Sequence, residues 1–69
     1  MSVAKIIEIS SSSPSSFEDA TRRGIATAGK TVKGIQGAWV SEQKVRVTEG
    51  LITEFRVTMR VTFMLSDKD

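Results

Sequence analysis

The chain has 69 residues, with ten Lys or Arg and eight Asp or Glu residues, so its formal net charge is only +2. We expect one domain spanning residues 1–69, of marginal stability alone, because a chain this short buries only about 60% of its unfolded surface. It contains no cysteine and no histidine, which excludes disulfides, thiolate zinc sites and histidine-based catalysis. Subunit association is the remaining source of stability.

The first residues, Met1–Glu8, contain no long apolar stretch, so we expect no signal peptide. No apolar run approaches the ~20 residues that a membrane helix needs. The small charge, with three phenylalanines and one tryptophan, does not form a nucleic-acid surface. We therefore expect a cytoplasmic protein that binds neither membranes nor nucleic acid.

Residues Val3–Ile9 are rich in β-branched side chains and predict a first strand. The serines at positions 10–13, followed by Pro14, predict a turn. No histidine is present to activate a serine hydroxyl, and no glycine elbow surrounds these serines. Because no acid–base or nucleophile arrangement is visible, we expect a protein that is not an enzyme.

A helix is predicted to begin at Ser15 or Ser16, because each serine is followed three residues later by an acidic residue, as in a capping box. Gly34 is predicted to end this helix in the left-handed conformation. Arg22 and Arg23 are expected on its solvated side. Mostly small residues recur at helical spacing and form its packing face, namely Phe17, Ala20, Gly24, Ala28 and Thr31, with Ile25 and Val32 beside them.

The clearest pattern is the alternation over Leu51–Leu65, where apolar residues fall mainly on one face and charged residues and threonines on the other. A strand of this length extends about 50 Å, more than one short helix covers, so we expect part of it to contact another subunit. Ala38–Thr48 predicts its partner strand, with the hairpin turn at Thr48–Gly50.

These elements predict an α+β fold of order β-α-β-β. One helix packs on the apolar face of a three-stranded, mainly antiparallel sheet. The charged face of the sheet is then left for water, a lumen or another subunit, and its open edges favour pairing with another copy.

Short motifs with a characteristic joint spacing run from Val3 to about Leu65. They comprise Val3, Lys5, Ile7 and Glu8; Ser13-Pro14, Ser16 and Glu18-Asp19-Ala20; Ala28, Thr31, Ile35 and Val40; and Phe55-Arg56-Val57-Thr58-Met59 with Val61-Thr62-Phe63. With this order and spacing, the chain resembles the dodecin family. The resemblance implies a hollow homododecamer, with helices outside and sheets lining the interior. It also implies storage of a flavin, FMN or riboflavin, between subunits.

The chain departs from the flavin-binding pattern of that family. There, a tryptophan on the second strand stacks on the flavin ring and a glutamine on the third strand hydrogen-bonds its edge. The tryptophan's position holds Gly37 here, the glutamine's position holds Arg56, and Met64 occupies a third position where several flavin binders carry arginine. The chain is therefore similar to the branch that lacks the flavin tryptophan. Trp39 lies two residues beyond Gly37, on the same strand face and about 7 Å away.

The candidate cofactor-binding residues are Trp39, Arg56 and Gln43. Trp39 is either a stacking platform for a planar ligand or a subunit contact. Arg56 either holds a phosphate or carboxylate in bidentate fashion or pairs with Glu42 or Glu54.

Oxygen ligands for calcium or magnesium at symmetry axes are a further candidate site, although no loop motif supports it. Its members would be Glu8, Glu42, Glu54, Asp67 and Asp69. The leading hypothesis is a non-enzymatic, oligomeric ligand-binding protein. One alternative is a structural shell that binds divalent metal or an anionic small molecule. Another is an interaction module that adds a strand from a partner protein to its sheet edge.

Overall fold

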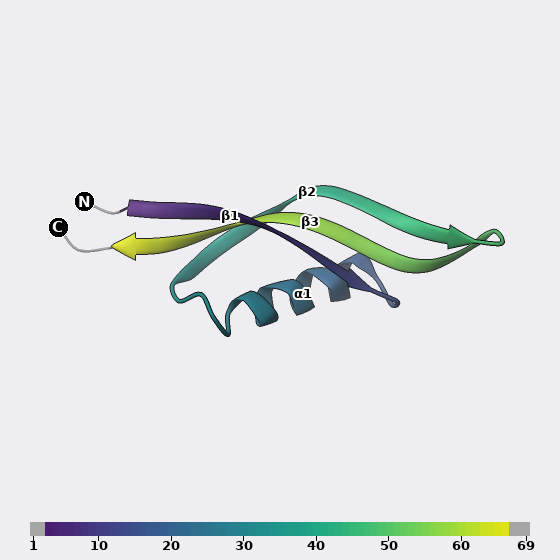
Figure 1. Cartoon of the computed structure of the whole chain (residues 1–69), viewed down its shortest axis with the longest axis horizontal. Coiled ribbons are helices and arrows are strands. Elements are labelled where there is room, and N and C mark those ends of the chain that lie inside the picture. Colours follow the sequence, from purple (N-terminus) through teal and green to yellow (C-terminus); the bar gives the residue numbers. More distant parts are fainter. Residues whose placement is uncertain (1–2, 67–69) are drawn as a thin grey trace.

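A computed structural model describes residues 3–66 and contains one helix and three strands. Their order is β1 (Val3–Ser13), α1 (Phe17–Ala28), β2 (Ile35–Thr48) and β3 (Leu51–Ser66). The strands form one sheet in the order β1-β3-β2, with both pairings antiparallel and α1 on one side (Figure 1). The predicted fold class is confirmed. No helix among the described residues has the length and apolarity needed to cross a membrane.

The predicted turn over the serines at positions 10–13 is wrong, because β1 continues through Ser13. These serines pair with β3, from Ser10 opposite Thr58 to Ser13 opposite Phe55, and this pairing outweighs their turn preference. Buried Ser13 then fixes the connection to the helix. Its hydroxyl donates to the Asp19 carboxylate and accepts from the backbone N–H of Ser15 at 3.0 Å.

The helix begins after Ser16, whose hydroxyl accepts from the backbone N–H of Asp19 at 2.9 Å, as expected of an N-cap. The predicted end at Gly34 is wrong, because α1 ends at Ala28. The carbonyl of Ala28 accepts from the N–H groups of both Thr31 and Val32, which closes a tight turn. Gly34 does have a positive φ of 79°, but it leads the chain into β2.

The core lies between α1 and the apolar face of β3. Val57, Met59 and Val61 are fully buried there, together with Ala20 of the helix. Gly24 allows the close approach of the two elements, because a Cβ atom at this position would lie 2.5 Å from the Met59 Cε. The predicted alternation of β3 is confirmed. The small packing face of the helix is confirmed as far as Ala28, whereas Thr31 and Val32 lie beyond the helix end and Thr31 is exposed.

Strands β2 and β3 form a long hairpin whose tip projects beyond α1 and β1 (Figure 1). Glu49 and Gly50 both have positive φ, 53° and 81°, as in the type I′ turn that suits a two-residue hairpin loop. The apolar side chains near this tip are exposed, namely Val45, Val47, Leu51 and Ile52. The expectation that β3 is too long to be covered by one short helix is confirmed.

Candidate functional site

The face of the sheet opposite α1 carries most of the charged side chains of the strands, and we call it the open face. Residues directly opposite each other on neighbouring strands project to the same side of the sheet, so the strand register identifies the residues of the open face. Glu8 lies opposite Arg60. Lys44 lies opposite Arg56, and Arg46 opposite Glu54.

Trp39 belongs to the open face, because it lies opposite Arg60 on β3. Its side chain is 47% exposed. Gly37 lies opposite Thr62 on the same face, so the expected relation between Gly37 and Trp39 is confirmed. A Cβ atom at Gly37 would meet no heavy atom within 4 Å, so the surface beside Trp39 is free to accept a planar group.

A shallow hollow of about 350 Å³ lies on the same face across β3, lined by Ile6, Glu8 and Arg60. The Arg60 guanidinium and the Glu8 carboxylate are 3.7 Å apart, and both side chains are more than half exposed. Such a pair contributes little to stability. The two side chains can therefore separate at low cost to meet a polar ligand beside Trp39.

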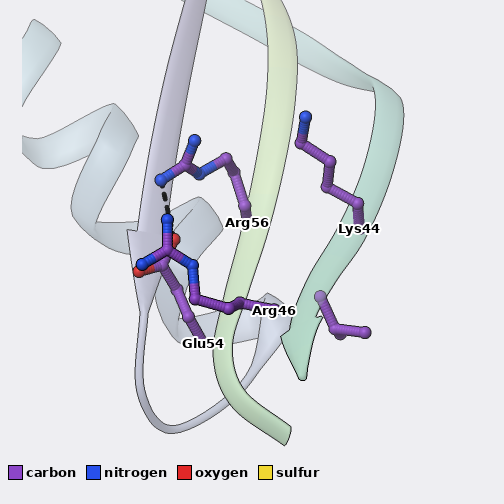
Figure 2. A pocket seen from close by; sticks show the side chains of 5 residues that line it. Lys44, Arg46, Glu54 and Arg56 are labelled. Carbon is purple, nitrogen blue, oxygen red and sulfur yellow. Dashed lines mark hydrogen bonds and ion pairs between the residues drawn. The ribbon is translucent and has the colours of Figure 1, made fainter. Parts of the chain in front are cut away.

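A second hollow, of about 320 Å³, lies near the hairpin tip and is lined by Lys44, Val45, Arg46, Glu54 and Arg56. We call it the hairpin groove. Figure 2 shows the Arg46 and Arg56 side chains directed toward Glu54. The Arg56 guanidinium donates to the Glu54 carboxylate at 2.7 Å. Of the two ion pairs expected for Arg56, the structure forms the one with Glu54; Glu42 lies opposite Thr58.

The three candidate cofactor-binding residues do not converge within one chain. Trp39 and Arg56 share the open face, but Arg60, the partner of Trp39, is four residues from Arg56, or about 13 Å along a strand. Gln43 lies opposite Val57, which is buried under α1, so Gln43 projects to the helix side of the sheet. Met64 is half-buried near the far end of β3, where its N–H donates to the Gly34 carbonyl. A site containing all three candidates needs more than one copy of the chain.

The candidate metal ligands are also dispersed. No group of three or more acidic side chains with metal-binding geometry occurs within residues 3–66. Glu8 and Glu54 pair with arginines, and Asp67 and Asp69 lie outside the described residues.

Arg22 and Arg23 form exposed ion pairs with Glu18 and Asp19 on the helix, which confirms the predicted solvated surface.

The role of Lys44 and Arg46 in forming the hairpin groove was not predicted from the sequence. Alternate spacing places Lys44 and Arg46 on one face of β2, and Glu54 and Arg56 on one face of β3, but only the strand register shows that these two faces coincide.

Comparisons with known proteins agree with the fold. The family model described as Dodecin matches residues 3–66, while a search of curated proteins finds no match. Dodecin from Streptomyces davaonensis is 29% identical, with a TM-score of 0.90 over 96% of this chain and 97% of that one. A tryptophan-to-phenylalanine variant of Thermus thermophilus dodecin is 27% identical, with a TM-score of 0.90 over 97% and 100%. The calcium dodecin of Mycobacterium tuberculosis, described as calcium chelating, is 32% identical, with a TM-score of 0.80 over 97% and 96%.

Proposed function

This chain belongs to the dodecin family, and on that basis we propose that it is a non-enzymatic homododecamer that holds small ligands on its open face. The observation that carries this proposal is the open face itself. It presents an exposed tryptophan beside free space and a separate charged groove, on a sheet whose other face is covered in part by α1. A surface of this kind binds planar or charged molecules.

The exposed apolar side chains at the hairpin tip support assembly. Leu51 is 70% exposed, Val47 56% and Ile52 53%. A small domain gains stability by burying such surface against other copies. Light scattering coupled to size exclusion should give the mass of twelve 7.5 kDa chains, about 90 kDa. A monomer or dimer would refute the dodecamer and favour the alternative of a sheet-edge interaction module.

The ligand that the family suggests is a flavin, FMN or riboflavin. Trp39 is the aromatic side chain available for stacking, and Arg56 can supply hydrogen bonds from a neighbouring region of the assembly. Riboflavin titrated against the assembled protein should lose its fluorescence on binding, and the loss should be much smaller in Trp39→Ala. Unchanged flavin fluorescence at micromolar protein would refute flavin binding.

A calcium-binding shell is the second candidate, favoured by the 32% identity to a dodecin described as calcium chelating. Because acidic side chains do not gather within the described part of one chain, such a site needs carboxylates from several copies. Calcium titration by calorimetry tests this candidate. A heat of binding that disappears in Glu42→Gln would support it, and no heat of binding would exclude it.

Binding without turnover agrees with the polar groups of the chain. There is no histidine or cysteine, and the hydroxyl of Ser13, the buried serine, is held by Asp19 and Ser15 at the start of the helix. We therefore propose storage or buffering of the ligand.

A further inference from the structure

The hairpin groove has an excess of positive charge. Three cationic side chains, Lys44, Arg46 and Arg56, line it together with one carboxylate, Glu54 (Figure 2). Within residues 3–66, the ion pair in this groove joins Arg56 to Glu54. No carboxylate of the described residues forms an ion pair with Lys44 or Arg46. The groove therefore has two cations more than the carboxylates of residues 3–66 neutralise.

The register places like charges directly opposite each other. Lys44 on β2 is the cross-strand partner of Arg56 on β3, and the next pair on the same face is Arg46 with Glu54. Like charges in directly opposite positions destabilise a sheet, whereas an oppositely charged group between them stabilises it. An anion lying between Lys44 and Arg56 would convert this repulsion into two attractions.

The size and chemistry of the groove favour a phosphate group. Its volume of about 320 Å³ is at the lower end of the range of about 300–1,000 Å³ typical of small-ligand sites. A guanidinium binds phosphate through two parallel hydrogen bonds, and a lysine adds a point charge. The Arg56 side chain is 40% exposed and Glu54 26%, so this part of the groove is partly shielded from water and salt.

We propose that the hairpin groove binds a phosphate group, either as inorganic phosphate or as the phosphate monoester of a small organic molecule. Glu54 is the resident counterion, and the phosphate displaces it from Arg56. This inference rests on the proposed function, since it names a ligand class for the open face of the assembly.

The test is calorimetric titration of the assembled protein with inorganic phosphate, in a low-salt buffer without phosphate at about pH 8, where the dianion prevails. Arg56→Gln and Lys44→Gln should each weaken binding by about tenfold or more, because each removes a charge-assisted contact. Glu54→Gln should tighten binding several-fold, because it removes the competing carboxylate. General destabilisation would not produce this increase.

Arg22→Gln is the matched control. Arg22 pairs with Glu18 at 2.7 Å, the same distance as between Arg56 and Glu54, but on the exposed side of the helix. It should leave phosphate binding unchanged. An equal loss in Arg22→Gln would show a general charge effect and overturn the site, as would weaker binding in Glu54→Gln. Circular dichroism and the assembly mass verify that each variant is folded.

Two further titrations separate the possible failures. Riboflavin, which lacks phosphate, tests the proposed function on the same preparation. If riboflavin fluorescence is quenched but phosphate gives no heat of binding, the phosphate site in the hairpin groove is refuted and the proposed ligand-binding function is retained. Ribose 5-phosphate, compared with ribose and inorganic phosphate, identifies the source. Tighter binding than inorganic phosphate supports an organic monoester, equal binding supports the free ion, and no binding of either phosphate compound overturns the proposal.

Discussion

The free space at Gly37 makes a gain-of-function test possible. This position lies on the open face beside Trp39, where the flavin-stacking tryptophan is expected in the family. A Cβ atom there would meet nothing within 4 Å, and Gly37 does not have the positive φ that requires glycine. Gly37→Trp should therefore fold normally and increase the affinity for riboflavin.

The size of this effect follows from the area of one indole face. Stacking on flavin buries about half of the 150–250 Å² of an aromatic side chain, roughly 100 Å². At ~25 cal/mol per Å² this contributes about 2.5 kcal/mol, within the ~1–3 kcal/mol found for stacking of a base on an aromatic side chain. The expected increase in riboflavin affinity is between about 5-fold and 150-fold.

The assay is quenching of riboflavin fluorescence by the assembled protein. The control is Ala38→Trp, which adds the same side chain to the same strand but on the helix side of the sheet, because Ala38 lies opposite the buried Val61. It should leave the affinity for riboflavin within about twofold of the parent protein, because it adds no stacking surface to the open face. If Gly37→Trp assembles normally and does not exceed this control, the open face beside Trp39 is not a flavin surface, and the reasoning is refuted.

Three stability predictions test the fold, each measured by urea unfolding at fixed protein concentration, since assembly makes apparent stability concentration-dependent. Met59→Ala should lower the free energy of unfolding by about 2–5 kcal/mol, because the side chain is fully buried between sheet and helix; a loss below about 1 kcal/mol would contradict this core. Ser16→Ala should cost about 1 kcal/mol and Ser16→Asp should restore it, since both Ser and Asp cap the Asp19 N–H; equal losses would argue against the cap. Gly50→Ala should cost about 1–2 kcal/mol because of its φ of 81°, while Gly37→Ala, without a positive φ, should cost much less.

The sequence alone was sufficient to predict features that depend on residues close together in the chain. The alternation along β3 identified Val57, Met59 and Val61 as core residues, and all three are fully buried. The N-cap was restricted to two neighbouring serines, because capping depends on a hydrogen bond within one helical turn. These features are encoded within a few residues of each other.

Features that depend on pairing between distant residues were harder to predict. The serines before Pro14 form a strand because β3 supplies their hydrogen-bond partners, although their composition favours a turn. The helix was predicted to end at Gly34, but Gly29 is also a suitable stop residue, and the structure ends the helix just before Gly29, which caps it.

The hairpin groove depends on an irregularity that composition does not reveal. Counting back from the turn, a regular hairpin would place Arg46 opposite Thr53. A register shift between Arg46 and Val47 places it opposite Glu54 instead, and this bulge gathers the charged side chains of the groove on one face. The sequence identified Arg56 as a candidate residue but did not predict the cations beside it.

The central position of β3 has a consequence for the order of folding. Of the three strands, β1 is synthesised first and its pairing partner β3 last, so Val3 can pair with Ser66 only after residues 3–66 have all been made. Because synthesis adds about 5–20 residues per second, β1 remains unpaired for several seconds after it is made. The hairpin of β2 and β3 closes through a two-residue turn, and we expect it to form before β1 adds to its free edge. A nascent chain that stops before Leu51 has no sheet on which its helix can pack.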